Sequence, residues 1–194
     1  MRQRLFLLIF ACVAAIAAGC RPDVHTAMAV ADEGYRHRRG NMAPVLPLRT
    51  PDGRQRKLTS ITGPLYVVGF VPAPPADRRN PAHPWLNDMA HKLRAEQVWV
   101  VQINVPAADA PWEDDCLARM DAGARNLLNV CDPMRSAHKA FGRPDLGTLL
   151  LVNHDGTIYE SGTIDHPERV LEIARREAEA HRRYIQSLLG ERAD

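Results

Sequence analysis

Cysteine is scarce in this chain of 194 residues: there are four, at positions 12, 20, 116 and 131. No two of them have the C-x-x-C spacing of dithiol redox motifs and of many metal sites. The sequence therefore excludes a reactive pair built from neighbouring cysteines. A phosphate-binding loop, a Ser-His-Asp set and paired carboxylates are also lacking, so no catalytic residue and no cofactor is predicted.

An excess of charge of one sign is also missing. The chain has 25 basic and 23 acidic residues, a formal net charge of +2. Arg2 and Arg4 belong to the N-terminal segment described next, and the rest of the chain is balanced at 23 of each. Affinity for nucleic acid comes largely from neutralising phosphates. We therefore expect no nucleic-acid partner.

The longest apolar run is too short to cross a bilayer. It spans Leu5 to Gly19, 15 residues, whereas about 20 are needed. Two arginines precede it and small residues follow, which is typical of an export signal over residues 1–19. The sequence Ala17-Ala18-Gly19-Cys20 resembles a bacterial lipobox, in which the cysteine is acylated, palmitate included, and becomes the mature N-terminus. The alternative is an ordinary cleavage site that leaves Cys20 as a free thiol.

The lipobox resemblance implies a lipoprotein of the bacterial cell envelope. Acyl chains on Cys20 would insert into the inner or the outer membrane, and the chain would face the periplasm. Residues 20–42 have little apolar patterning and are predicted to be a tether. Residues 43–194 then form one domain.

The domain is predicted to be organised around an apolar stretch from Leu65 to Pro75, whose lack of helical period indicates a strand buried on both faces. A helix follows, with Trp85, Met89 and Leu93 on one stripe. Further predicted elements are a hairpin within 45–58, strands at 98–105 and 127–131, helices at 112–120 and 134–141, a hairpin of 148–152 with 157–161, and a last helix from His166-Pro167 to about Leu189.

Four segments in this order resemble the redoxins, the family of thioredoxins, periplasmic thiol oxidoreductases and peroxiredoxins. They are APVLPLRTPDG, YVVGFVP, NLLNVCDPMRSAHKAFG and GTLLLVNHDGTIYESG. The resemblance implies a thioredoxin-like α/β fold: a central mixed sheet flanked by helices, with an N-terminal β-hairpin and a long C-terminal helix.

The same resemblance places the family's reactive residues on positions that lack thiols. The C-x-x-C positions fall on Pro75 and Arg78, and the peroxiredoxin cysteine falls near Arg79. Gly147 stands where the family has a proline, normally cis. The chain thus looks like a redoxin without its active site. The loop with Pro75, Arg78, Arg79 and Trp85 is a candidate binding loop instead.

Two roles are open for the members of this loop. Guanidinium groups near a helix N-terminus can hold an anion or a carboxylate of a partner; otherwise Arg78 and Arg79 are simply solvated. Trp85 is either the apolar floor of the site or a core residue.

Cys116 and Cys131 are the only thiols within the predicted domain. An oxidising compartment favours a structural disulfide between them, and closing the 15-residue loop would contribute about 3 kcal/mol in the loop-entropy model. Two unpaired cysteines and a displaced catalytic pair are the alternatives. Asp114 and Asp115 precede Cys116 and make a catalytic pair less favourable, because nearby carboxylates raise the pKa of a thiol.

Together these patterns predict a non-catalytic binding or scaffold protein of the envelope that recognises a protein partner. The alternative is a thiol-disulfide oxidoreductase or antioxidant redoxin that works through Cys116 and Cys131. No metal site is predicted, since His83 and His91 supply only two ligands. The helix beyond Ala178 is expected either to cap the domain or to bind a partner.

The lipid anchor is directly testable. Bacterial lipoproteins carry several acyl chains, and more than one chain gives stable attachment. We expect the mature protein to begin at Cys20 and to stay with membranes through a high-salt wash. Cys20→Ser should move most of the protein into the soluble fraction, measured by fractionation and immunoblot. Equal retention of Cys20→Ser on membranes would refute the anchor.

Overall fold

A computed structural model describes residues 39–45, 47–49, 55–58, 61, 63–74, 81–107, 123–132 and 134–190. The chain divides into two compact units, residues 1–35 and 36–194, and every described residue belongs to the second. The predicted export signal, most of the predicted tether and the predicted helix at 112–120 lie outside the described residues. No helix of the described part is both long and apolar enough to cross a membrane.

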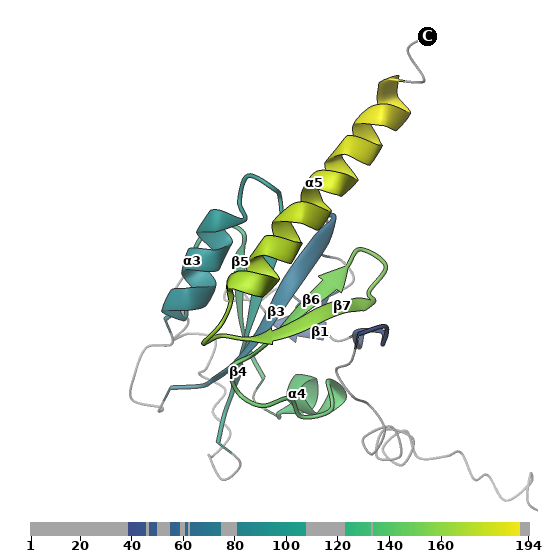
Figure 1. The fold of residues 1–194 in the computed structure, drawn as a ribbon. Coiled ribbons are helices and arrows are strands. Elements are labelled where there is room, and N and C mark those ends of the chain that lie inside the picture. Colours follow the sequence, from purple (N-terminus) through teal and green to yellow (C-terminus); the bar gives the residue numbers. More distant parts are fainter. Residues whose placement is uncertain are drawn as a thin grey trace, which may run out of the picture. The chain divides into compact units, whose positions relative to one another are not determined.

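A five-stranded mixed sheet forms the centre of the domain (Figure 1). Its strands are β3 (Leu65–Pro72), β4 (Trp99–Val105), β5 (Leu127–Cys131), β6 (Thr148–Asn153) and β7 (Ile158–Thr163), in the order β5-β4-β3-β6-β7. β3, β4 and β5 are parallel, whereas β6 and β7 run antiparallel. All five were predicted, β7 from the hairpin turn that precedes it. Seven of the eight residues of β3 are buried, as a central strand requires.

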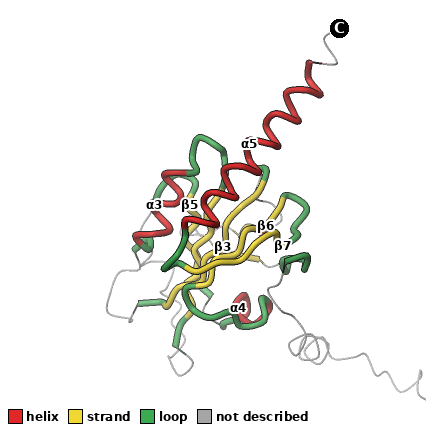
Figure 2. Tube along the Cα trace, in the orientation of Figure 1, coloured by secondary structure: helices red, strands yellow, loops and turns green. Residues whose placement is uncertain are grey.

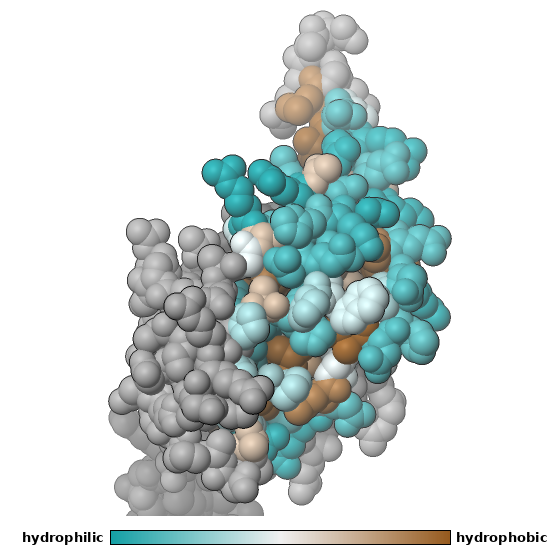
Figure 3. Space-filling model, turned by 90° about the vertical axis from the view of Figure 1, so that its left-hand side faces the viewer, coloured by the Kyte–Doolittle hydropathy of each residue, from teal (hydrophilic) through white to brown (hydrophobic). Residues whose placement is uncertain are grey.

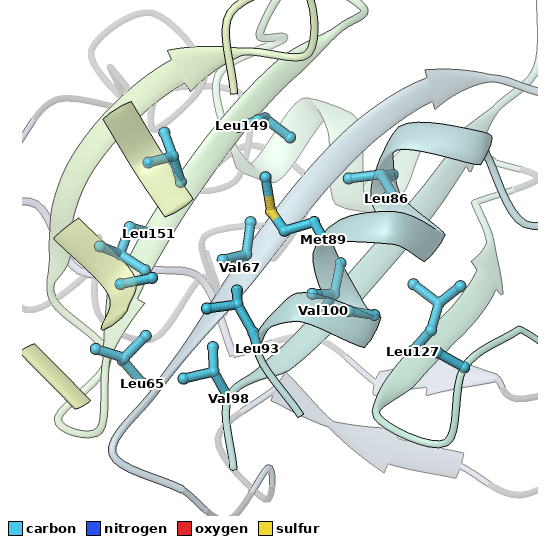
Figure 4. Close-up of a cluster of buried hydrophobic side chains, with 14 of the residues drawn as sticks. Leu65, Val67, Leu86, Met89, Leu93, Val98, Val100, Leu127, Leu149 and Leu151 are labelled. Carbon is cyan, nitrogen blue, oxygen red and sulfur yellow. The ribbon is translucent and has the colours of Figure 1, made fainter. Parts of the chain in front are cut away.

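Helices cover both faces of this sheet, as predicted (Figures 1 and 2). α3 (Pro84–Lys92) and α5 (Glu168–Gly190) lie on one face and α4 (Ser136–Ala140) on the other. The core below α3 and α5 is formed by alternate residues of the strands and by the inner faces of both helices (Figure 4). Its members include Val67, Val100 and Leu151 from the strands, Met89 from α3 and Ala174 from α5. On the α4 face, Phe70 packs edge-on against Phe141, with ring centroids 5.2 Å apart.

α3 buries a different stripe from the one that the sequence indicated. Met89 and Leu93 are buried as predicted, but Trp85 is 52% exposed and Leu86 is completely buried. Leu86 reaches the sheet because β3 has a glycine there. A Cβ on Gly69 would lie 2.8 Å from the nearest Leu86 methyl carbon. Trp85, one residue earlier, therefore points away from the sheet, and its interpretation as a core residue was wrong.

The first described residues of the chain pair with the hairpin of β6 and β7. The backbone N–H of Gly40 donates to the carbonyl of Ile158 (2.8 Å), and that of Ala43 donates to the carbonyl of Gly156 (2.7 Å). Contacts with the domain thus begin slightly before residue 43. The predicted N-terminal hairpin is confirmed as β1 (Pro47–Arg49) paired antiparallel with β2 (Gln55–Lys57).

α5 confirms the long C-terminal helix, but its second half does not cap the domain. Val170, Ala174 and Ala178 are buried against the sheet, and every residue from 182 to 189 is exposed. This end extends past the sheet (Figures 1 and 2) and carries apolar side chains on its last turns (Figure 3). The apolar side chains exposed here are Tyr184, Ile185, Leu188 and Leu189.

Neighbouring residues of α3 test this packing. Leu86→Ala should lower the free energy of unfolding by about 2–5 kcal/mol, because it removes a fully buried side chain and leaves a cavity. Trp85→Ala removes a larger but exposed side chain and should change it by no more than about 0.5 kcal/mol. Urea unfolding of both variants measures the difference. A larger loss in Trp85→Ala would contradict the orientation of α3.

Candidate functional site at the carboxyl edge of the sheet

Three parallel strands end at the same edge of the sheet. β3 ends at Pro72, β4 at Val105 and β5 at Cys131, and the antiparallel strand β6 begins there at Thr148. In open α/β sheets, ligands bind outside the carboxyl ends of the strands. We call this surface the carboxyl edge. It is also the edge at which α3 begins.

The start of α3 is fastened to the sheet by one buried side chain. His83 stands before the helix in an extended conformation, and Pro84 is in the first turn, where a missing N–H costs nothing. The backbone N–H of His83 donates to Oε1 of Gln102 (2.6 Å), and Nε2 of Gln102 donates to the carbonyl of Pro81 (3.3 Å). Gln102 is only 1% exposed. The residues that lead into α3 are therefore fixed to β4.

This contact continues as a row of amides across β4 and β5. Nε2 of Gln102 also donates to Oδ1 of Asn104 (2.9 Å). Nδ2 of Asn104 donates to Oδ1 of Asn129 (2.6 Å) and to the carbonyl of Val130 (2.8 Å). All three amide side chains are buried. We call Gln102, Asn104 and Asn129 the amide ladder. It puts polar groups where the rest of the sheet under α3 is apolar.

The amide ladder was missed in the sequence, although a signal for it exists. In the run VWVVQINV, Gln102 and Asn104 alternate with buried apolar residues and so lie on one face of the strand. Their register pairs Gln102 with Asn129 and Asn104 with Cys131. Two amides in an otherwise apolar strand indicate a buried polar contact, because an unpaired buried amide is costly. What they contact becomes visible only when β5 and the 81–83 segment are placed.

Cys131, the last residue of β5, lies on the same face as the ladder. It is 8% exposed and is disulfide-bonded. The other three cysteines lie outside the described residues, so the pairing with Cys116 stays a prediction.

The carboxylate next to Cys131 has a structural role. Oδ1 of Asp132 accepts the backbone N–H of Ala137 (3.0 Å), and Oδ2 accepts the backbone N–H of His138 (2.7 Å). Both donors are free N–H groups at the start of α4, which the carboxylate caps. This accounts for the helix that follows shortly after β5.

The redoxin resemblance places the family's proline at position 147, and the backbone of Gly147 shows why this chain has no proline there. Its φ is +96°, which proline cannot adopt, and its N–H donates to the carbonyl of Phe70 (2.6 Å). Within the described residues no peptide bond is cis. The carbonyl of Gly147 accepts the N–H of Ile164 (2.7 Å), so this residue ties β3 to the segment after β7.

Three connections at the carboxyl edge carry exposed apolar side chains. Trp85 lies in the first turn of α3, Met134 follows β5, and Leu146 precedes β6; they are 52%, 66% and 48% exposed. Topology puts all three at the carboxyl edge. Of the predicted binding loop, only Trp85 belongs to the described part of the chain; Pro75, Arg78 and Arg79 lie outside it, as does Cys20.

The histidines and the methionine considered as metal ligands do not come together. Met89 is buried in the core, His91 is exposed on α3, and His83 is held at the helix start. Among the described residues there is no group of three or more His, Cys, Asp or Glu side chains that could hold a metal ion.

Comparison with known proteins identifies the fold. No family model matches the chain, and no curated protein matches its sequence. Similar solved structures include a protein assigned as the thiol:disulfide interchange protein DsbE from Chlorobium tepidum: 22% identity, 74% of this chain and 96% of that one, TM-score 0.52. A domain assigned as a thiol-disulfide isomerase from Cytophaga hutchinsonii has 17% identity over 74% and 97% of the two chains, with a TM-score of 0.50.

The domain therefore has a thioredoxin-like fold, as the redoxin resemblance implied. At these identities the similarity shows the fold alone. In this fold the ladder, the start of α3 and Gly147 lie together at the carboxyl edge, and no thiol stands at the start of the helix.

His83 gives this site a pH dependence. Burial lowers the pKa of its imidazole below the usual value, and its buried Nδ1 has no hydrogen-bond partner among the described residues. The unfolded chain therefore takes up a proton near pH 6.5, before the folded one does, so stability is lost as the pH falls below that value.

We expect His83→Gln to lose less stability than the wild type between about pH 7.5 and pH 5.5, measured by urea unfolding. His91→Gln is the matched control, since His91 is exposed on the same helix, and it should keep the wild-type dependence. Parallel curves for the wild type and His83→Gln would contradict the burial of this imidazole.

Proposed function

We propose that the chain is a binding protein of the bacterial cell envelope, tethered by lipid at Cys20 and facing the periplasm, whose carboxyl edge recognises a protein partner without redox turnover there. One observation carries the proposal: the residues that lead into α3 are Pro81 and His83, clamped by Gln102. A redoxin nucleophile needs a thiolate at this helix end, where the N–H groups and the dipole lower its pKa. The chain has no cysteine between positions 20 and 116.

The composition of the edge favours a protein partner that presents apolar side chains. Trp85, Met134 and Leu146 expose apolar side chains at this edge. Aromatic residues and methionine are enriched in protein interfaces. The ladder itself is satisfied internally at Gln102 and Asn104, so it holds the surface in shape rather than offering its own hydrogen bonds. The arginines Arg78 and Arg79 would add charge to this surface.

A second function is favoured by the disulfide of Cys131. It lies at the same edge, and a disulfide there can take two electrons from a dithiol of a partner, which is oxidised in exchange. The chain would then be a thiol-disulfide oxidoreductase working through Cys131 and Cys116. Thiol:disulfide interchange is also the printed assignment of the Chlorobium tepidum protein. Asp132 opposes this function, because a carboxylate beside a cysteine disfavours its thiolate.

Turnover assays separate the two functions. The purified mature chain should neither reduce insulin nor consume peroxide above the buffer rate, since the helix end lacks a thiol. The disulfide should resist a mild dithiol, and replacing both Cys116 and Cys131 by alanine should lower the melting temperature while leaving partner capture intact. Turnover that is present in the wild type and lost in Cys131→Ala would establish the oxidoreductase instead.

Variants of the edge test the binding role. Trp85→Ala and Leu146→Ala should each reduce crosslinking to a partner in envelope extracts by about tenfold, as expected for central apolar contacts. Val45→Ala is the control, since Val45 is 62% exposed but lies before β1. Capture that is equal for all three variants would remove the carboxyl edge as the binding surface.

A further inference from the structure

Two histidine rings meet on the surface where α5 leaves the domain. His154 lies in the turn between β6 and β7 and is exposed, and His181 is half-buried on α5. Their ring centroids are 5.8 Å apart, and their planes are inclined by 44°. The hairpin turn and the helix thus each contribute one imidazole to the same place.

The pair lies at the last point of contact between α5 and the hairpin. One turn earlier, the hydroxyl of Tyr159 on β7 donates to Oε1 of Glu177 (3.1 Å). On the opposite side of the helix, Arg182 donates to the carbonyl of Ala95 (3.4 Å). From residue 182 onward the helix is exposed. A link between His154 and His181 would therefore hold the base of the projecting end.

The separation of the rings suits a shared metal ion. Imidazole nitrogen is a good ligand for zinc, copper and nickel. Zn–N bonds are about 2.0–2.1 Å long, so two rings bound to one ion have centroids about 5–6 Å apart once the ring radii are added. The observed 5.8 Å falls in this range, and the inclination excludes face-to-face stacking.

Charge next to the pair also favours a cation. Asp155 follows His154 in the turn, and its Oδ1 accepts the backbone N–H of Thr157 (2.8 Å). Glu177, one turn before His181 on α5, is ion-paired with Arg176 (3.0 Å) and therefore adds no net charge beside the pair. The positive Arg182 is directed toward Ala95.

We propose that His154 and His181 together bind one divalent transition-metal ion, of the zinc, nickel and copper class, with water completing its coordination. The ion clamps α5 to the β6–β7 turn and fixes the direction of the exposed apolar end of the helix. No third His, Cys, Asp or Glu of the described part is placed to join them. The site therefore has fewer protein ligands than an ordinary zinc site, and the ion it binds is weakly held and exchangeable. This inference is independent of the function proposed for the carboxyl edge.

Calorimetric titration of the tag-free mature chain with ZnCl₂, NiCl₂ or CuCl₂ tests the site. The wild type should bind one ion per pair, reversibly on addition of EDTA. His154→Ala and His181→Ala should each weaken binding at least about tenfold, since either removes half of the protein ligands. The double variant should show no saturable binding at this site, because no protein ligand remains. His91→Ala and His166→Ala, each an exposed histidine elsewhere on the domain, should bind like the wild type.

Two further readouts locate the ion. At about 100 times the dissociation constant, the ion should raise the melting temperature by roughly 5–10 °C in the wild type and not in His154→Ala. Bound Cu²⁺ should give an electron paramagnetic resonance spectrum with two nitrogen ligands, and with fewer in either variant. Unchanged stoichiometry and affinity in the double variant, or no saturable binding by the wild type, would overturn the proposal. Unchanged circular dichroism of the metal-free variants confirms that they are folded.

Discussion

The side chain of Gln102 is the contact on which the arrangement of the carboxyl edge depends. It accepts from His83, donates to the carbonyl of Pro81 and donates to Asn104, so all its hydrogen-bonding groups are used. Because it is buried, water cannot replace any of these partners without opening the structure, and a lost partner costs about 1–3 kcal/mol. The segment before α3 and the ends of β4 and β5 are thereby held as one piece.

This construction bears on the proposal that the start of α3 carries no thiol chemistry. A reactive thiol at a helix start needs free N–H groups and access to solvent. Here the N–H of His83 is already bound to Gln102, and Pro84 has none to offer. The hydrogen bonds of Gln102 also hold the first turn of α3, which carries the exposed Trp85, in place. A side chain on a rigid element loses little further conformational entropy when it binds a partner.

The projecting end of α5 follows from a mismatch of lengths. The strands beneath it, β3, β6 and β7, have six to eight residues, about 20–26 Å, whereas a 23-residue helix is about 35 Å long. Small residues bring the first half close to the sheet: a Cβ on Gly162 would lie 2.7 Å from Val170 Cγ2, and Ala174 and Ala178 follow. Beyond them there is no sheet left to cover. The apolar residues near Leu188 therefore stay exposed, although they continue the same periodic pattern.

The sequence by itself determined the strands and the last helix, because buried strands, hairpin turns and amphipathic helices leave patterns that depend on local spacing. The thioredoxin-like fold was implied by the resemblance of four segments to the redoxins. The absence of a C-x-x-C pair also follows from the positions of four cysteines. Only the tertiary structure decided which side of α3 is buried, since Gly69 on another element makes room for Leu86 and leaves Trp85 in water. It alone brought Gln102 to His83 and His154 to His181, because contacts between residues far apart in the chain depend on how the elements pack.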